Sequence, residues 1–235
     1  MDSGLLDTLV PLFERQTGIR TRVLAVGSGQ ALKLGGRGEV DLIISHAPHA
    51  EERFMTQGKG SGRVPIFEND FLLVGPTDDP ARVRSLSADD GFRRIAAGRH
   101  LFVSRGDDSG TDQAEKGVWH RLGIIPQGQS WYQESDTGMG QTLIIASEKR
   151  AYTVTDRGTW LAFSGRLSLT PLGTLSVTNR YHLILVNPRL HPKVNAQGAE
   201  RFRAFLRSPE TTRLVGRFGA DRFGVPLFRP VTGER

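Results

Sequence analysis

The segment "SRGDDSGT", residues 104–111, combines an arginine, two aspartates and two hydroxyl side chains. Arg105 supplies a fork of charged donors that suits a tetrahedral oxyanion. Ser109 and Thr111 add hydroxyl donors, and Gly110 allows the backbone to approach a ligand closely. If a helix begins at Ser109, its first N–H groups are unpaired and its positive dipole end attracts an anion. The segment alone fits an anion site and a helix cap beside a surface ion pair equally well.

Two other segments repeat the order of strand, glycine-containing turn and helix. "AVGSGQ" places Ser28 and Gly29 at a helix start, and "SDTGMGQ" places Gly138 and Gly140 at another. Three such helix starts suit a cleft that surrounds an anion with neutral dipoles. Neither segment carries the Gly-Lys-Ser/Thr of a P-loop or the complete dinucleotide fingerprint.

Enzyme chemistry is not expected. "GDDSGT" is not the Gly-x-Ser-x-Gly elbow of hydrolases, and no His/Asp pattern supports Ser109 as a nucleophile. His46 and His49 lie three residues apart without an evident third ligand, so a zinc site is not expected. The sequence therefore predicts no catalytic residues, no metal ligands and no cofactor.

Composition narrows the class of protein further. The chain has 235 residues, of which 37% are hydrophobic, and a net charge of +6 with no cysteine. The basic residues are scattered, and no zinc-finger, basic-zipper or RRM pattern is present, so nucleic acid is not an expected partner. No apolar run reaches the length of a transmembrane helix, and the N-terminus lacks the pattern of a signal peptide.

The apolar periodicity predicts strands that alternate with helices. "TRVLAVG", "VDLIISHA", "NDFLLVGP" and "HLFVSRG" are typical of buried strands, and each is followed by a helical segment. The first helix should end at Gly18. Such alternation favours an α/β fold with a mainly parallel sheet flanked by helices.

Two similar strands, "NDFLLVGPTDDP" and "NRYHLILVNPRLHP", enclose the middle of the chain. They predict two lobes: residues 1–76 plus 179–235 form the discontinuous lobe I, and residues 77–178 form lobe II. Two hinge strands would join the lobes around a cleft that closes on a ligand. The alternative is a single domain with two similar edge strands.

A resemblance to the periplasmic tungstate-binding proteins of ABC importers extends over nearly the whole chain. It is carried, in order, by "SGLLDTLVPLFERQTGI", "AVGSGQALKLGGRGEVDLIISHAP", "SRGDDSGT", "GMGQTLIIASEKRAYTVTDRGTW" and "FGADRFGVPLF". The resemblance implies the two-lobed type II periplasmic-binding fold and a tetrahedral oxyanion ligand, tungstate or molybdate. It also implies a monomer that delivers this ligand to a membrane permease from the periplasm or the extracellular side.

The related phosphate binders carry a similar Arg-x-Asp-x-Ser-Gly-Thr loop. That pattern maps onto Arg105, Asp107, Ser109, Gly110 and Thr111, so the resemblance implies that the arginine and the last three residues hold the oxyanion. A fully ionised tungstate would be repelled by Asp107, which is therefore expected to pair with Arg105 or cap the helix. Phosphate remains an alternative ligand, because this aspartate could accept the proton of monoprotonated phosphate.

The sequence departs from the resembled family at two places. Family members carry a Thr-Thr-Thr-Ser stretch before the "SGLLD" helix, where this chain has only Met1-Asp2-Ser3. Ser28 stands where the family usually has threonine, and this exchange retains a hydroxyl. The first departure leaves a second alternative open, a cytoplasmic oxyanion sensor or orphan domain that has lost the N-terminal ligand loop.

Overall fold

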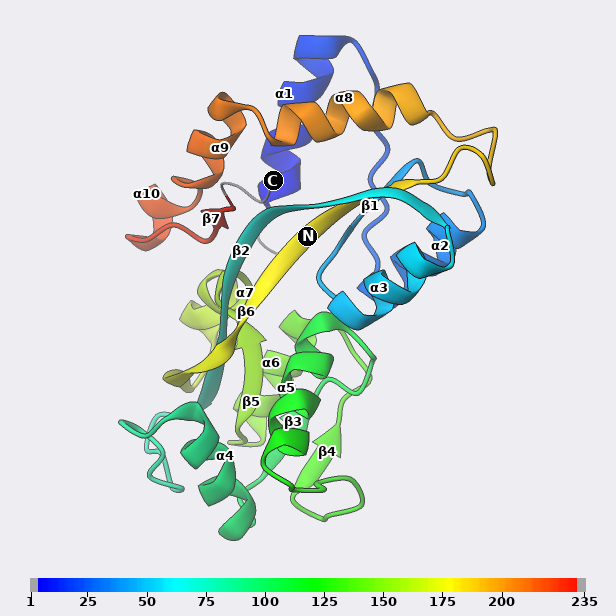
Figure 1. Cartoon of the computed structure of the whole chain (residues 1–235). Helices are drawn as coiled ribbons and strands as arrows, with labels where there is room; N and C mark the ends of the chain where they lie inside the picture. Colours follow the sequence, from blue (N-terminus) through cyan, green and yellow to red (C-terminus); the bar gives the residue numbers. More distant parts are fainter. Residues whose placement is uncertain (1–3, 232–235) are drawn as a thin grey trace. The chain divides into compact units, whose positions relative to one another are not determined.

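The computed structural model describes residues 4–231, which divide into two compact units (Figure 1). The first unit contains the described residues up to Glu68 and those from Arg180 on, and the second contains Asn69–Asn179. The lobe boundaries predicted from the sequence differ from these unit boundaries, because they lie after residues 76 and 178. The predicted lobe I also includes residues 1–3 and 232–235, which lie outside the described residues. The assignment of two ligand-binding lobes stays a prediction.

The first unit is formed by the two ends of the chain, drawn in blue to cyan and in yellow to red in Figure 1. Its elements are α1 (Leu5–Thr17), α2 (Ser28–Gly36), β1 (Leu42–Ser45), α3 (Pro48–Thr56), α8 (Ala196–Leu206), α9 (Pro209–Val215), α10 (Ala220–Phe223) and β7 (Arg229–Pro230).

The second unit is formed by the middle of the chain, drawn mainly in green. Its elements are α4 (Ala88–Ala97), β3 (Phe102–Ser104), α5 (Gly110–Arg121), β4 (Tyr132–Glu134), α6 (Met139–Glu148), β5 (Thr153–Asp156), α7 (Arg157–Phe163) and a 3-10 turn at Ser164–Arg166. Within residues 4–231 no helix is long and apolar enough to cross a membrane.

Two long strands, β2 (Gly60–Pro76) and β6 (Leu169–Val186), contribute residues to both units. They belong to a sheet with the order β1-β6-β2-β5, and β7 pairs with β2. The pairs β1–β6, β2–β5 and β2–β7 are antiparallel, whereas β3 and β4 form a separate parallel pair. The α/β class is confirmed, but the expectation of mainly parallel sheets is wrong for the larger sheet. A buried apolar run reads the same in either strand direction, so the pattern could not make this distinction.

The segment "TRVLAVG" was expected to form a strand, and this expectation is wrong. Residues 18–27 form no regular element in the structure. Val23, Leu24 and Val26 are 38%, 43% and 46% exposed. A β-branched run becomes a strand only when a neighbouring strand pairs with it, and none of the described strands does so.

Helix α1 follows directly from its sequence. Leu5, Leu9 and Phe13 recur at helical spacing and are buried, so one face of the helix joins the core of the first unit. The ring of Phe13 packs edge-on against Phe202 of α8, with the ring centroids 4.9 Å apart. Gly18 takes a φ of 71° and donates its N–H to the carbonyl of Glu14 at 2.8 Å, which confirms the predicted end of the helix.

An aromatic cluster holds β3 and α5 together in the second unit. The ring of Trp119 on α5 lies 4.5 Å from that of Phe92 and 5.4 Å from that of Phe102 on β3, between ring centroids. Tyr132 on β4 stacks on Phe102 at 5.9 Å. All four side chains are buried. The loop between β3 and α5 therefore starts and ends on packed elements.

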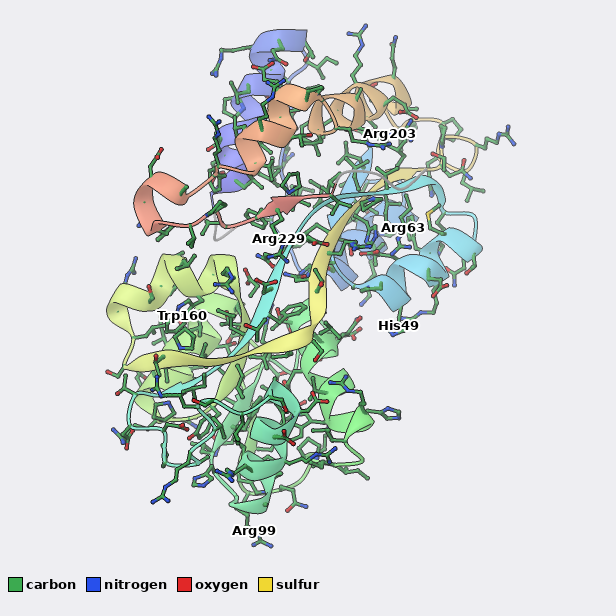
Figure 2. The ribbon with its side chains drawn as sticks, turned by 60° about the vertical axis from the view of Figure 1, so that its left-hand side comes forward. His49, Arg63, Arg99, Trp160, Arg203 and Arg229 are labelled. Atoms are coloured by element: carbon green, nitrogen blue, oxygen red, sulfur yellow. The ribbon has the colours of Figure 1, made fainter. Side chains whose placement is uncertain are left out.

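The basic side chains are spread over several elements, as the sequence suggested. Figure 2 labels Arg63 on β2, Arg99 after α4, Arg203 on α8 and Arg229 on β7. This distribution differs from the single basic stripe that is typical of nucleic-acid-binding domains.

Candidate anion-binding loops

The loop from Arg105 to Ser109 turns sharply between β3 and α5. Gly106 has a φ of 69° and Asp108 a φ of 55°, both in the left-handed region. The Gly106 N–H donates to Oδ1 of Asp112 at 2.9 Å. A Cβ on Gly106 would lie 2.7 Å from the Cβ of Glu134, so only glycine fits at this point without a shift of the backbone.

The N-terminus of α5 presents two backbone donors. Ser109 caps the helix, since its Oγ accepts the N–H of Asp112 at 3.3 Å. The first backbone hydrogen bond of the helix is donated by the Gln113 N–H to the Ser109 carbonyl at 2.9 Å. In the described part of the chain, the N–H groups of Gly110 and Thr111 donate no hydrogen bond, although both residues are buried. Buried orphan N–H groups are rare in proteins, and a pair at a helix start suits an anion.

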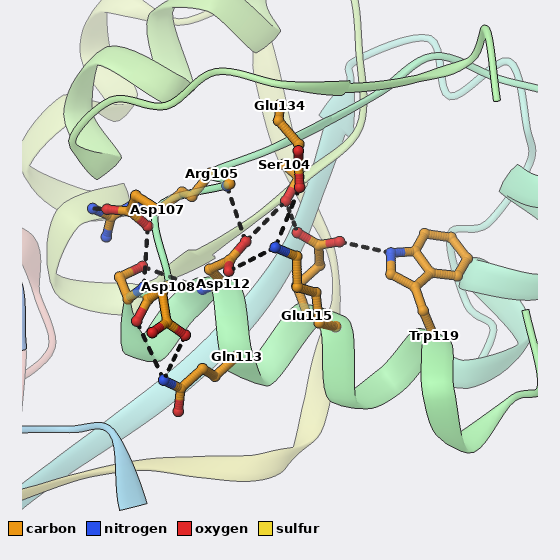
Figure 3. A network of polar contacts seen from close by, with 12 residues as sticks. Ser104, Arg105, Asp107, Asp108, Asp112, Gln113, Glu115, Trp119 and Glu134 are labelled. Atoms are coloured by element: carbon orange, nitrogen blue, oxygen red, sulfur yellow. Dashed lines mark hydrogen bonds and ion pairs between the residues drawn. The ribbon is translucent and has the colours of Figure 1, made fainter. Parts of the chain in front are cut away.

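Arg105 lies beside this helix start and is largely covered, with a side chain 12% exposed. Its Nη2 forms a short ion pair with Oδ2 of Asp107 (Figure 3). Its Nε donates to the Thr137 carbonyl at 3.3 Å. The other carboxylate oxygen of Asp107 accepts the Ser109 N–H at 3.2 Å. The structure thus contains the pairing of Asp107 with Arg105 that the sequence led us to expect.

The contact from Arg105 to Thr137 brings the start of α6 next to the same loop. Gly138 precedes α6 and has no side chain, so it cannot accept a hydrogen bond from the first N–H groups of that helix. A Cβ on Gly138 would have no atom within 4 Å, whereas a Cβ on Gly140 would lie 2.4 Å from the ring of Phe163. Gly138 therefore leaves space for a ligand, while Gly140 is required for packing between α6 and α7.

The third glycine-containing helix start belongs to the first unit. Helix α2 begins at Ser28 after Gly27, which offers no side-chain cap. The Oγ of buried Ser28 accepts the N–H of His46 at 3.3 Å, and a Cβ on Gly29 would have no atom within 4 Å. The structure thus brings five of the predicted residues together around one loop, namely Arg105, Ser109, Gly110, Thr111 and Gly138, whereas Gly140 packs against Phe163. The joining of Ser28 and Gly29 to them in one ligand site stays a prediction.

A buried polar network below the loop was not anticipated from the sequence. Glu115 on α5 is 2% exposed, and burial, reinforced by the nearby charge of Asp112, raises the pKa of its carboxyl to about 7. Ser104 at the end of β3 contacts both Glu115 and Asp112, and Asp112 in turn holds the Gly106 N–H. The spacing from Ser109 to Asp112 resembles a capping box, and this spacing is the sequence signal that could have pointed to the Asp112 part of the network. Within residues 4–231, no group of three or more potential metal-ligating side chains is found.

Comparison with known proteins identifies close relatives. Residues 1–210 match a family model described as a PBP superfamily domain. The chain is 41% identical to the tungstate-binding protein TupA of Peptoclostridium acidaminophilum, over 97% of this chain and 82% of the relative. It is 40% identical to a putative ABC transporter anion-binding protein of Haloferax volcanii, over 97% of this chain and 68% of the relative.

Solved structures of tungstate- and molybdate-binding proteins are also similar to this chain. The tungstate-binding protein TupA of Desulfovibrio alaskensis G20 is 39% identical and superimposes with a TM-score of 0.84, covering 99% of this chain and 95% of that chain. A periplasmic molybdate-binding protein of Azotobacter vinelandii is only 14% identical and has a TM-score of 0.65, covering 98% of this chain and 95% of that chain. This second likeness concerns the fold alone.

Proposed function

Because the chain belongs to the PBP superfamily, and within it to the family that includes these TupA proteins, we propose that it is a solute-binding protein that captures tungstate or molybdate for an ABC importer. The tungstate-binding relatives support the ligand, and the relative from Haloferax volcanii supports the link to an ABC transporter. The protein binds and releases its ligand and catalyses no reaction. It acts as a monomer in the periplasm or outside the cell.

The observation that carries this proposal is the start of α5. The N–H groups of Gly110 and Thr111 have no acceptor among the described residues, and the Arg105 guanidinium lies beside them. Two backbone donors, a helix dipole and one cation can together stabilise the charge of a bound dianion, so a second positively charged side chain is not needed. A rigid cap at Ser109 fixes the donors before the ligand arrives, which lowers the entropic cost of binding.

The contacts of Asp107 favour a fully ionised anion over protonated phosphate. One of its carboxylate oxygens accepts the Ser109 N–H, and the other pairs with Arg105. With both oxygens engaged, Asp107 has a diminished capacity to accept a proton from a ligand. Tungstate and molybdate are dianions that need no such acceptor, so this arrangement supports them as the ligands.

We further propose that the start of α2 contributes to ligand binding. Ser28 and Gly29 would donate to the oxyanion there through the serine hydroxyl and the first N–H groups of the helix. The long strands β2 and β6, which contribute residues to both units, would serve as the hinge for closure. Sulfate is also a tetrahedral dianion, so discrimination against it would depend on the size of the cavity.

Isothermal titration calorimetry with tungstate, molybdate, sulfate and phosphate under identical conditions tests this function. We expect saturable binding of tungstate and molybdate, with sulfate and phosphate much weaker. Absence of binding of all four anions by the folded protein would refute the proposal. Phosphate displacing bound tungstate at equal concentration would replace the proposed ligand by phosphate.

A further inference from the structure

Beneath the anion-binding loop, Glu115 is buried with every oxygen in contact. Its Oε1 accepts hydrogen bonds from Nε1 of Trp119 at 2.7 Å and from the hydroxyl of Tyr132 at 2.9 Å. Its Oε2 lies in short contact with Oγ of Ser104. Figure 3 shows this carboxyl pointing from α5 toward the end of β3.

The same serine oxygen has a second carboxylate neighbour. Ser104 Oγ lies 3.2 Å from Oδ1 of Asp112, which is 1% exposed. This Oδ1 also accepts the Gly106 N–H at 2.9 Å, and Oδ2 pairs with Nζ of Lys116 at 2.9 Å. Asp112 therefore links Ser104 to the left-handed glycine of the loop.

The number of protons in this network determines which contacts are favourable. The hydroxyl of Ser104 carries one hydrogen, but two carboxyl oxygens, on Glu115 and Asp112, lie within hydrogen-bond distance of it. If both carboxyls are ionised, one of the two contacts sets lone pairs against each other in a buried environment, which is costly. If Glu115 carries a proton on Oε2, it donates to Ser104, and Ser104 donates to Asp112. Both contacts are then hydrogen bonds.

We propose that Glu115 is protonated on Oε2 in the ligand-binding form of the protein and acts, through Ser104 and Asp112, as a positioning residue for the Arg105–Ser109 loop. The chain of donors runs from Glu115 to Ser104 and on to Asp112, which holds the Gly106 N–H. The importance of this positioning for a ligand rests on the proposed function, whereas the protonation itself does not.

The surroundings of Glu115 favour the neutral carboxyl. Burial, followed by the charge of Asp112, raises the pKa of Glu115 to about 7 against the hydrogen bonds that it accepts. The other titratable groups next to this network are Tyr132 and Glu134 on β4 and Lys116 on α5. Lys116 bridges Asp112 and Glu134, so its positive charge is shared with these two carboxylates and is not directed at Glu115.

Two further elements, α4 and β5, pack against α5, and each carries a carboxylate that is engaged elsewhere. Asp89 on α4 pairs with Arg121 at the last residue of α5, at 2.7 Å. Asp156 at the end of β5 accepts the Thr159 N–H at 2.9 Å as the cap of α7. Among the described residues, neither carboxylate contacts Ser104 or Glu115.

Deprotonation should therefore loosen the loop. When Glu115 loses its proton, the Ser104 hydroxyl turns to the new carboxylate, and Asp112 loses one of its donors. The added negative charge also lies in the unit that holds the anion. If binding requires the protonated form, the apparent affinity scales with the protonated fraction. With a pKa of about 7, the affinity should be roughly tenfold weaker at pH 8 than at pH 6.

The test is calorimetric titration of tungstate between pH 6 and pH 9 with the wild type, Glu115→Gln and the matched control Glu148→Gln, whose exposed carboxyl lies at the end of α6. The glutamine amide can donate to Ser104 at every pH, so we expect a flat profile for Glu115→Gln. The wild type and Glu148→Gln should share the decline of roughly tenfold from pH 6 to pH 8. Parallel profiles for all three proteins would overturn the proposal.

An infrared measurement without ligand separates this inference from the proposed function. The wild type should show the carbonyl band of a buried protonated carboxylic acid at pH 6, lost by pH 9, and Ser104→Ala should shift its frequency. Absence of the band at pH 6 overturns the protonation whether or not Glu115→Gln folds. Presence of the band without tungstate binding at any pH would refute the proposed function alone.

Discussion

Arg105→Ala removes a cation that lies beside the start of α5, in the second unit's candidate site. The guanidinium is largely covered and anchored to the Thr137 carbonyl, so its position is fixed before a ligand binds. Its loss has two consequences. The oxyanion loses a charged donor, and Asp107 loses its counter-charge while still held by the Ser109 N–H.

The magnitude follows from these two effects. Truncation of one partner of a desolvated charge pair costs about 2–5 kcal/mol, so we expect tungstate binding to weaken by about 2–4 kcal/mol, or roughly 30- to 700-fold. A dianion at roughly 7 Å from the unpaired Asp107 is repelled by about 1 kcal/mol even in a water-like dielectric. The double variant Arg105→Ala/Asp107→Asn should therefore recover about 1 kcal/mol, since asparagine can still accept the Ser109 N–H.

The assay is calorimetric titration of tungstate with the wild type, Arg105→Ala, Asp107→Asn and the double variant, which together form a double-mutant cycle. Thermal unfolding of each protein without ligand checks that the second unit is intact. An affinity of Arg105→Ala within twofold of the wild type would refute the role given to this residue. Equal affinities of Arg105→Ala and the double variant would refute the repulsion by Asp107.

Three further predictions concern stability and the glycines. The free energy of unfolding should fall by about 3 kcal/mol as pH rises from about 4.5 to about 7, because the folded protein keeps the Glu115 proton, whose pKa is raised to about 7, and the unfolded chain does not. Denaturation of the wild type and of Glu115→Gln across this pH range measures the effect, and equal pH slopes for the two proteins would contradict it. Gly106→Ala should destabilise the protein by more than about 1 kcal/mol, because this position has a positive φ and a Cβ would collide with Glu134, whereas the matched Gly117→Ala in an exposed part of α5 should stabilise it by about 0.5–1 kcal/mol. Thermal unfolding of both variants measures these shifts, and equal shifts would be inconsistent with the loop geometry. Gly138→Ala should weaken tungstate binding with little effect on the melting temperature, and Gly140→Ala should lower the melting temperature because its Cβ meets an aromatic ring; the reverse pattern would contradict the roles given to these glycines.

Local signals in the sequence were sufficient to predict where α5 begins and where α1 ends. Ser109 is a preferred capping residue followed by a helical apolar pattern, and the structure has the cap at this position. Gly18 ends α1 in the left-handed conformation that favours glycine. These features depend on a few consecutive residues, so they could be inferred without knowledge of the tertiary structure.

Features that depend on distant residues could not be predicted in this way. The segment around Val23 and Leu24 has strand propensity, yet it remains unpaired because pairing needs a partner strand from elsewhere in the chain. The residues next to Glu115 in the sequence do not indicate its burial, because this burial arises from Trp119, Tyr132 and the end of β3 packing around it. Its protonation depends on these neighbours and not on its own segment.

The most direct test of the oxyanion site is a crystal structure of the protein with tungstate, in which the tungsten atom is located by its anomalous scattering. We expect one strong peak, with ligand oxygens about 3 Å from the N–H groups of Gly110 and Thr111 and from the Arg105 guanidinium. A peak at another place, or no peak at saturating tungstate, would contradict the assignment of this loop as the anion-binding site.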